Sequence, residues 1–328
     1  MKILVTGGAG YIGSHIVKAF QSKNFEVTVL DNFSTGNLWS IKNCEILNID
    51  LCNRILLKKK LKNRKFDFVI HLAAKSDIEE SISNPKYYYR NNVIGSLNLI
   101  NTMIDNDINN IIFSSSASIY GNTKNIKIDE SSEKLPINPY GSTKLIIENF
   151  IRNLSYSYGF NSISLRFFNV AGANIANKIG EFREKETHLI PLLLNSILLN
   201  KKFKIYGDKY NTKDGTCIRD YLHIDDLVDA HFKCIAYIKQ HNKYREFNLG
   251  SGKGFSIFEI INAIEKITNS NIKFSVVEPR VGDPAMLIAE IQRAKEELNW
   301  IPKNDLNSII LSSWEWQKLC TSSNDFFR

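Results

Sequence analysis

The sequence contains no apolar run long enough to cross a bilayer. Its most apolar stretch, residues 189–199, is interrupted by Pro191 and Asn195 and is far shorter than the roughly 20 residues that a membrane-spanning helix needs. Residues 1–5 run directly into a glycine-rich segment and lack the apolar core of a signal peptide. We therefore expect a cytoplasmic protein with no membrane partner.

Cysteine and histidine are too few and too scattered to organise the fold. The five cysteines are odd in number and none lies in a Cys-x-x-Cys pair, which favours reduced thiols in an intracellular protein. The six histidines show no spacing typical of metal ligands, so we expect no metal site. Internal repeats and low-complexity segments are also lacking.

Charge of one sign is not concentrated in one region. The 42 basic and 34 acidic residues leave a net charge of +8 over 328 residues. The densest basic run, residues 58–65, is typical of the exposed side and end of a helix, where cations suit the helix dipole. Nucleic-acid-binding proteins cluster their charge, so we expect no nucleic-acid partner. A positive surface would still attract a diphosphate substrate.

The chain does contain a regular alternation of short apolar strands with helical patterns. The predicted strands are residues 3–5, 27–30, 45–49, 67–71, 110–114 and 162–167, and the predicted helices are residues 11–22, 91–104, 140–158, 187–200 and 228–240. Nearly continuous apolar strands that alternate with helices predict an α/β fold, a doubly wound parallel sheet covered on both faces. In such sheets the ligand lies beyond the carboxyl ends of the strands.

The alternation ends after Phe168, which predicts two interleaved parts. We expect residues 1–170 to form a dinucleotide-binding domain and residues 171–328 a smaller α/β domain that binds substrate. Residues 247–250 predict a strand that returns to the main sheet. A segment near 213–250 is therefore assigned to the larger domain.

A glycine-punctuated turn, residues 7–13, joins the first predicted strand to its helix. Gly7, Gly10 and Gly13 let the backbone approach a phosphate, and the helix start offers N–H donors to an anion. Asp31 follows Gly13 by eighteen residues, at the end of the second predicted strand. A carboxylate there accepts hydrogen bonds from the adenine ribose and repels a 2′-phosphate. The pattern predicts that the protein binds NAD rather than NADP.

Tyr140 and Lys144 lie four residues apart, on one face of a predicted helix. A phenol titrates near pH 10 in water, so a base at neutral pH needs roughly 4 kcal/mol of stabilisation from neighbouring positive charge. Lys144 and an oxidised nicotinamide ring would supply that charge. Serines end the fifth predicted strand, and one of them could bridge a substrate hydroxyl and Tyr140. The arrangement predicts redox chemistry on an alcohol.

Two polar segments of the second half each contain an arginine that suits a diphosphate. They are residues 219–226, which begin with Arg219, and residues 278–283, which contain Arg280. A guanidinium group binds phosphate oxygens in pairs, but either arginine could equally form a structural ion pair.

These motifs together resemble those of one family. Besides the glycine turn and the Tyr/Lys pair, the matching stretches are residues 113–121, 166–173 and 214–223. The chain resembles the extended short-chain dehydrogenase/reductases, most closely the UDP-glucose 4-epimerases (UDP-galactose 4-epimerases), nearly from end to end. The Asp-Gly-Thr-x-x-Arg-Asp-Tyr stretch is the most specific part. The resemblance implies a Rossmann-type domain, a tightly held NAD and interconversion of UDP-glucose and UDP-galactose.

The resemblance also implies a role for each catalytic residue. Tyr140 would take the proton of the sugar 4-hydroxyl, Ser116 would relay or hydrogen-bond it, and Lys144 would hold the nicotinamide ribose. Hydride would leave sugar C4 and return to the opposite face once the 4-keto sugar has turned over, with no net oxidation.

The residues that the resemblance places at the ligands form two sets. Those expected at NAD are Gly7, Gly10, Tyr11, Ile12, Gly13, Asp31, Asn32, Asp50, Leu51, Leu72, Ala73, Ala74, Asn91, Ser114, Tyr140, Lys144 and Phe167. Those expected at the UDP-sugar are Ser116, Tyr140, Asn169, His188, Leu189, Tyr206, Arg219, Arg280, Asp283 and Leu287.

Departures from the family pattern bear on reaction and substrate. Related 4,6-dehydratases carry an Asp-Glu pair where this chain has Ala117 and Ser118, which disfavours elimination of water. Leu287, at the position that resembles the pocket gatekeeper, is intermediate in size and leaves UDP-N-acetylhexosamines open as substrates. His188 stands where some members have Asn, so its sugar contact is open.

Two other functions are compatible with the motifs. One is a 4-epimerase of UDP-N-acetylglucosamine/galactosamine or of another UDP-sugar. The other is a non-catalytic NAD(H)-binding regulator, against which the intact Tyr140, Lys144 and Ser116 argue. The resemblance further implies a homodimer formed through the helices at residues 91–104 and 140–158.

Overall fold

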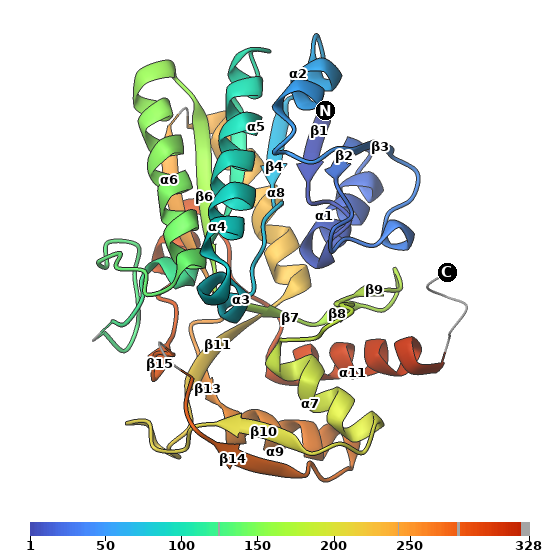
Figure 1. Ribbon diagram of the computed structural model, residues 1–328, viewed down its shortest axis with the longest axis vertical. Coiled ribbons are helices and arrows are strands. Elements are labelled where there is room, and N and C mark those ends of the chain that lie inside the picture. Colours follow the sequence, from blue (N-terminus) through green and yellow to red (C-terminus); the bar gives the residue numbers. More distant parts are fainter. Residues whose placement is uncertain (124, 242, 281–282, 323–328) are drawn as a thin grey trace.

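A computed structural model of the protein describes residues 1–123, 125–241, 243–280 and 283–322. Within these residues seven parallel strands form the main sheet, in the order β12-β6-β5-β4-β1-β2-β3 (Figure 1). They are β1 (Lys2–Thr6), β2 (Glu26–Asp31), β3 (Glu45–Asn48), β4 (Phe68–His71), β5 (Asn110–Ser116), β6 (Asn161–Phe167) and β12 (Tyr244–Leu249). The predicted doubly wound parallel sheet is confirmed.

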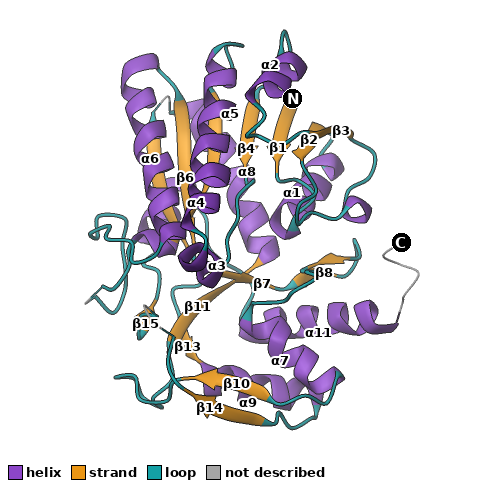
Figure 2. Cartoon of the chain, viewed as in Figure 1, coloured by secondary structure: helices purple, strands orange, loops and turns teal. Residues whose placement is uncertain are grey.

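Helices cover both faces of this sheet (Figure 2). One face carries α1 (Tyr11–Ser22), α8 (Ile224–Gln240) and α10 (Gln292–Leu298), and the other carries α2 (Arg54–Leu61), α5 (Gly95–Ile104) and α6 (Pro139–Tyr158). Neighbouring strand residues point to opposite faces, so Ile3 and Val5 belong to one core and Leu4 to the other. Burial on both sides explains why the strands are apolar throughout.

A smaller unit packs below the carboxyl ends of the strands in Figure 1. Its strands are β7 (Asn169–Ala171), β8 (Ala173–Asn174), β9 (Ile179–Gly180), β10 (Phe203–Tyr206), β11 (Ile218–His223), β13 (Gly254–Ser256), β14 (Phe274–Val277) and β15 (Met286–Leu287). Its helices are α7 (Leu189–Leu198), α9 (Ile257–Thr268) and α11 (Leu306–Ser322), which share a third core. Shorter helices lie in the connections: η1 (Leu38–Ser40), α3 (Ile78–Ser83), α4 (Pro85–Tyr88), the π-helical η2 (Tyr89–Ile94) and η3 (Ala117–Ile119).

Segments of the second half of the chain alternate between the main sheet and the smaller unit, and the sequence indicates only part of this alternation. β12 pairs with β6, so residues 244–249 complete the sheet. β11, within the predicted returning segment 213–250, instead pairs with β7, β13 and β15 of the smaller unit. α10, outside that segment, packs on α8 and β12. The boundary at residue 170 stays a prediction.

Three predicted helices start more than one residue away from the prediction, and the one predicted at residues 187–200 is α7, Leu189–Leu198. α8 begins at Ile224 rather than at residue 228, because the His223 side chain caps it by accepting the Asp225 N–H at 3.1 Å. The helix predicted from residue 91 begins as the π-helical η2, and regular α5 starts at Gly95.

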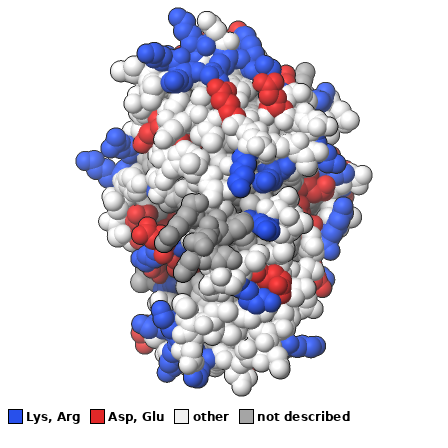
Figure 3. Space-filling model, turned by 90° about the vertical axis from the view of Figure 1, so that its right-hand side faces the viewer, with Lys and Arg blue, Asp and Glu red and all other residues white. Residues whose placement is uncertain are grey.

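The dense basic run, residues 58–65, covers the last turn of α2 and the residues that follow it, as its spacing predicts. Lys58, Lys59 and Lys60 form the last turn of that helix. Figure 3 shows Lys and Arg side chains gathered at the top of the molecule, the end where α2 lies in Figure 1. Lys58 pairs with Asp105 at 2.7 Å, so the run is partly neutralised. None of the described helices combines the length and the apolar character that crossing a membrane requires.

A buried ion pair joins α6 to the main sheet. Arg166 of β6 donates to both Glu148 oxygens of α6, at 3.1 Å and 2.9 Å. A further guanidinium nitrogen donates to the Tyr120 hydroxyl at 2.8 Å and to the Glu130 carbonyl at 3.1 Å. Both charged side chains are almost completely buried, so each depends on the other for its solvation.

Glu148→Gln should destabilise the protein by about 3–5 kcal/mol, because it leaves the Arg166 charge buried without a counter-charge. Urea unfolding followed by circular dichroism measures the change. The matched control is Asp107→Asn, which removes the exposed partner of Lys65 and should change stability little. Equal losses in the two variants would contradict the expected role of burial.

Buried histidines make the fold sensitive to acid, among them His71 of β4, whose pKa burial lowers to about 3, and two in helices. His15 of α1 and His231 of α8 each have one ring nitrogen, Nδ1, 2.8 Å from the carbonyl four residues earlier. Burial lowers the pKa of both side chains to about 4. The unfolded chain therefore takes up these protons first, and stability present above about pH 6.5 is lost as the pH falls toward 4.

His231→Leu should lose less stability on acidification than the parent. From the pKa difference, the protonation of this one histidine in the unfolded chain removes about 2 kcal/mol from the parent between pH 7.5 and pH 5. Unfolding free energies of both proteins at the two pH values test this. The same pH dependence in parent and variant would show that His231 is not responsible.

Candidate active site

The carboxyl ends of the parallel strands meet at one edge of the main sheet, next to the smaller unit (Figure 1). Thr6, His71, Ser116 and Phe167 are the last residues of four neighbouring strands, β1, β4, β5 and β6. The predicted catalytic and cofactor residues lie at or directly after these positions. The topology therefore brings together residues from distant parts of the chain.

The glycine turn between β1 and α1 packs against the loop after β4. Gly7 has a φ of +70°, and a Cβ there would lie 2.7 Å from the backbone nitrogen of Ala73. A Cβ on Gly13 would lie 2.2 Å from the Gly7 carbonyl oxygen. Gly10 is the N-cap of α1 and has no side chain to bond the first-turn N–H groups. A helix start of this kind fits the pyrophosphate of a dinucleotide.

Asp31 ends β2 beside the glycine turn. Its carboxylate accepts the N–H of Ala9 at 2.9 Å and that of Phe33 at 2.8 Å. Burial raises the pKa of Asp31, and these backbone donors oppose the shift. A carboxylate with two oxygens retains acceptor sites for ribose hydroxyls, so this position fits the adenosine end of NAD.

A buried asparagine that the sequence analysis missed ties the loop after β4 to α6. The Asn92 side chain accepts the Lys75 N–H at 2.8 Å and donates to the Lys75 carbonyl at 3.0 Å and to the Thr143 hydroxyl at 3.1 Å. Asn91, a predicted NAD contact, donates to Asn92 at 2.9 Å. Both lie in the π-helical η2, a conformation common at functional sites. The pattern over 91–104 predicted a continuous helix and did not indicate this interruption.

Tyr140 and Lys144 occupy the first two turns of α6, beside the end of β5. The Lys144 ammonium donates to the Ser114 carbonyl at 2.6 Å. It lies 5.0 Å from the ring centroid of Phe113 and 5.8 Å from that of Tyr140. One of its three donors is thus used by Ser114, which leaves two for ribose hydroxyls.

Burial dominates the titration of both side chains. It raises the pKa of Tyr140, whereas a hydrogen bond with Ser116 and the charge of Arg183 lower it. It lowers the pKa of Lys144 to about 7, opposed by the charge of Glu148. The phenol therefore keeps its proton at neutral pH until more positive charge is placed beside it. The sequence indicated Lys144 as one source of this charge, and the structure adds Arg183.

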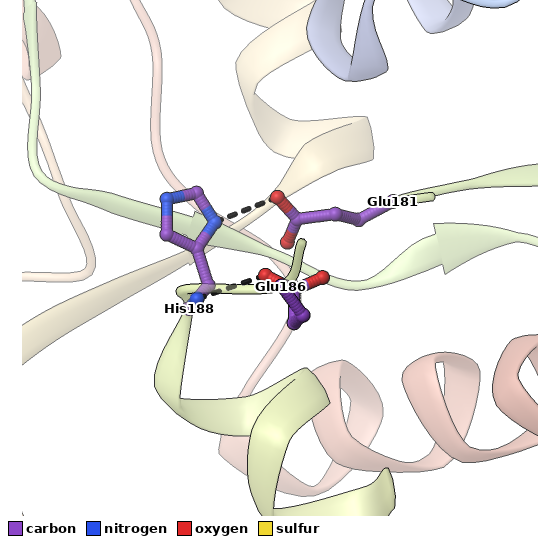
Figure 4. A group of neighbouring side chains, drawn as sticks. All are labelled: Glu181, Glu186 and His188. Atoms are coloured by element: carbon purple, nitrogen blue, oxygen red, sulfur yellow. Dashed lines mark hydrogen bonds and ion pairs between the residues drawn. The ribbon is translucent and has the colours of Figure 1, made fainter. Parts of the chain in front are cut away.

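Arg183 belongs to a charged cluster that the sequence analysis missed. Its Nε donates to Oε1 of the buried Glu181 at 2.8 Å, and Nδ1 of His188 lies 2.7 Å from the same oxygen (Figure 4). Glu186 accepts the backbone N–H of His188 at 2.8 Å. The three residues Glu181, Glu186 and His188 present possible metal ligands within 4.8 Å of one another. Both carboxylates already have partners, however, and the Arg183 charge disfavours a cation there.

Four predicted substrate residues lie on or beside one small sheet. Arg219 of β11 is in register with Leu287 of β15 and forms an ion pair with Asp283. Asn169 of β7 is in register with Tyr221 of β11 and hydrogen-bonds its phenol. These side chains come from three separate segments, the outermost more than 100 residues apart in sequence, and β11 joins them.

Arg280 joins the two units. Its Nε lies 2.9 Å from an oxygen of Glu79 in α3, and its guanidinium carbon lies 4.0 Å from the ring centroid of Tyr206. Both Arg219 and Arg280 thus form ion pairs within the protein, the alternative that the sequence left open. A diphosphate uses the same guanidinium donors as a carboxylate, so Asp283 and Glu79 would compete with it.

The other predicted contacts extend along the same edge. Tyr11 and Ile12 start α1, Asn32 follows β2, Asp50 and Leu51 follow β3, Leu72, Ala73 and Ala74 follow β4, Phe167 ends β6, and Leu189 starts α7 after His188. Asp50 and Leu51 follow β3, the edge strand at the opposite end of the sheet from β12 and β6. The predicted cofactor contacts therefore extend along the strand ends from β6 to β3, as those of an extended dinucleotide would.

Comparisons with known proteins agree with this arrangement. Residues 3–250 match the NAD dependent epimerase/dehydratase family. A UDP-glucose 4-epimerase of Halalkalibacterium halodurans is 41% identical over 320 residues, which are 97% of this chain and 96% of that protein. The structure of a Brucella ovis UDP-glucose 4-epimerase in complex with NAD is 37% identical, has a TM-score of 0.91, and is matched over 96% of this chain and 97% of that one.

A further solved structure is similar over the whole chain. It is the UDP-Glc/GlcNAc 4-epimerase of Campylobacter jejuni, 39% identical with a TM-score of 0.84, matched over 97% of this chain and 99% of that one. Fold, site geometry and sequence similarity lead to one conclusion. The chain belongs to the NAD dependent epimerase/dehydratase family.

Proposed function

We propose that the protein is an NAD-dependent UDP-hexose 4-epimerase that interconverts UDP-glucose and UDP-galactose. The observation that carries the proposal is the position of the buried Lys144 beside the half-buried Tyr140 at the carboxyl edge of the dinucleotide-binding sheet. Arg219 and Arg280 on the smaller unit supply cations for a diphosphate. Relatives named UDP-glucose 4-epimerase that are 41% and 40% identical over nearly the whole chain support it.

NAD, when bound, provides the hydride acceptor and donor at sugar C4. Tyr140 takes the proton of the 4-hydroxyl while hydride leaves the same carbon, and returns that proton once hydride has come back. Ser116 hydrogen-bonds the phenol and keeps it aligned with the sugar hydroxyl. Lys144 uses its remaining donors to hold the ribose. Arg219 and Arg280 hold the diphosphate, so that the 4-keto sugar can turn its opposite face to the nicotinamide ring of NAD.

The residues after Ser116 favour epimerisation over elimination. Removal of water from a 4-keto sugar needs an acid and a base next to C5 and C6. Ala117 has no ionisable group, and the Ser118 hydroxyl does not titrate near neutral pH as a carboxyl group does. Neither position supplies the required proton transfer.

A 4-epimerase of UDP-N-acetylglucosamine and UDP-N-acetylgalactosamine is the second candidate. Leu287 favours it in part, because a medium-sized side chain beside Arg219 leaves more room than a tyrosine would. A solved structure of a UDP-Glc/GlcNAc 4-epimerase is also 39% identical to this chain. The least favoured candidate is a non-catalytic NAD(H)-binding regulator, since it would not need the Tyr140, Lys144 and Ser116 arrangement.

We also propose a cytoplasmic homodimer formed through the η2–α5 segment and α6. Apolar side chains exposed on these elements support it: Tyr89 at 39%, Ile94 at 50%, Ile146 at 41% and Tyr156 at 78%. Burial of such side chains against a second copy would remove them from water. The cytoplasmic location rests on the five thiols, none of which forms a disulfide.

Tyr140→Phe should reduce turnover of UDP-galactose by roughly 10²-fold or more, because a phenyl ring cannot accept the 4-hydroxyl proton. Bound NAD, measured after denaturing the purified protein, should stay at the parental level. Tyr158→Phe, at the exposed end of the same helix, is the matched control and should turn over normally. Near-normal turnover in Tyr140→Phe would exclude it as the base.

The function itself is tested by incubating the purified protein with UDP-galactose and, separately, with UDP-N-acetylgalactosamine, without added cofactor. NMR spectroscopy then follows the appearance of each 4-epimer. We expect conversion of UDP-galactose to UDP-glucose, and conversion of the acetylated sugar alone would favour the second candidate. If neither sugar reacts, even with added NAD, the protein does not have the proposed activity.

A further inference from the structure

The loop between β2 and β3 forms part of the predicted ribose site. It follows Asp31 directly, and residues 32–41 include the predicted NAD contact Asn32. Within the larger unit the loop is tied to the glycine turn: the Asn37 N–H and the Ser40 hydroxyl donate to the Ala9 carbonyl, at 2.9 Å and 3.1 Å. The loop's position therefore sets the shape of the site beside Asp31.

The same loop also contacts the smaller unit. The Asn37 side chain donates to the Phe182 carbonyl at 3.3 Å. The Trp39 ring meets the Phe182 ring edge to face, with centroids 5.8 Å apart and an interplanar angle of 84°. On α11, the Trp316 ring stacks with Trp39 at 6.0 Å and 29°. In Figure 1 the β2–β3 connection reaches down toward β9 and α11, as these contacts require.

The smaller unit's side of this contact is closely packed. Trp316 is 1% exposed and donates its indole N–H to the Glu181 carbonyl at 2.7 Å. A Cβ on Gly180 would lie 2.5 Å from the Trp316 ring, so the indole lies directly against the β9 backbone. The Glu181 carboxylate in turn holds Arg183. A chain of contacts thus runs from the predicted ribose loop to the charged cluster that acts on Tyr140.

We propose that Trp39, Phe182 and Trp316 form an aromatic clasp that retains bound NAD, with Trp39 as its central positioning residue. The inference rests on the NAD-dependent function proposed above. On this proposal a dinucleotide beside Asp31 leaves when residues 32–41 move away from the glycine turn, to which Asn37 and Ser40 hold them, and the clasp resists that movement. An epimerase takes hydride from the sugar and returns it, so cofactor release is not a step of its cycle. Slow release therefore does not limit turnover.

Trp39→Ala should release NAD about tenfold faster than the parent, because it removes both aromatic contacts. The protein is loaded with isotopically labelled NAD and diluted into excess unlabelled NAD, and the label still bound is counted over time. Phe182→Ala should also release NAD faster than the parent. The release rate of the double variant should be at most twice that of the faster single variant. Trp39→Phe, which keeps an aromatic ring, should lie between parent and Trp39→Ala.

Leu38→Ala is the matched control, because Leu38 is a neighbour in the same loop and is 60% exposed. Its release rate should stay within twofold of the parent. Circular dichroism and thermal unfolding of each variant separate faster release from a loss of folding. Added NAD should restore the turnover that Trp39→Ala loses at limiting NAD, which a general structural defect would not allow.

Release from folded Trp39→Ala within twofold of the parent would overturn the clasp. Effects of Trp39→Ala and Phe182→Ala that multiply fully in the double variant would show that the two rings act separately, which also overturns it. The release assay needs no substrate. If the parent converts no UDP-sugar, the proposed function fails while the clasp is still decided by the release rates.

Discussion

The removal of Lys144, and in part of Tyr140, from water at the start of α6 is the constraint on which the rest of the site depends. Removal from water raises the pKa of the phenol and lowers that of the ammonium, so neither is in its reactive charge state without added partners. The helix that carries them must therefore be held accurately. Glu148 binds it to Arg166 of β6, and the Thr143 hydroxyl binds it to Asn92. The two bonds thus join α6 to two different elements, β6 and η2.

The sequence was sufficient to predict where residues lie when their position depends on local spacing. The glycine turn, Asp31 and the Tyr140/Lys144 pair follow short patterns whose geometry the backbone fixes, and the parallel sheet follows from its doubly buried strands. It was insufficient where a partner lies far along the chain. Arg183 lies in a polar segment without a periodic pattern, and only the return of that segment across the strand ends brings it near Tyr140. Nor does any local pattern mark the π-helical turn that buries Asn92.

The charged residues of the smaller unit are a second case in which the sequence did not indicate the partner of a side chain. Arg219 and Arg280 stood out as possible diphosphate ligands, and the structure pairs them with Asp283 and Glu79. These pairs do not argue against ligand binding, because a buried or half-buried guanidinium needs a counter-charge in the absence of ligand. Glu79 belongs to the larger unit, so an exchange of this carboxylate for a diphosphate would alter a contact between the two units. If Arg280 binds the diphosphate as proposed, substrate binding would be linked through it to the relation of the units.

The chemistry of an epimerase explains why contacts between the units should concern the cofactor as well as the sugar. A dehydrogenase must exchange its nicotinamide cofactor after every turnover, which favours an open cofactor site. An enzyme that returns the hydride gains nothing from exchange, and loss of the keto intermediate would leave the cofactor reduced. Selection for retention can then act at positions remote from the reacting carbon. Trp39, whose ring touches the smaller unit while its backbone lies in the loop after Asp31, occupies such a position.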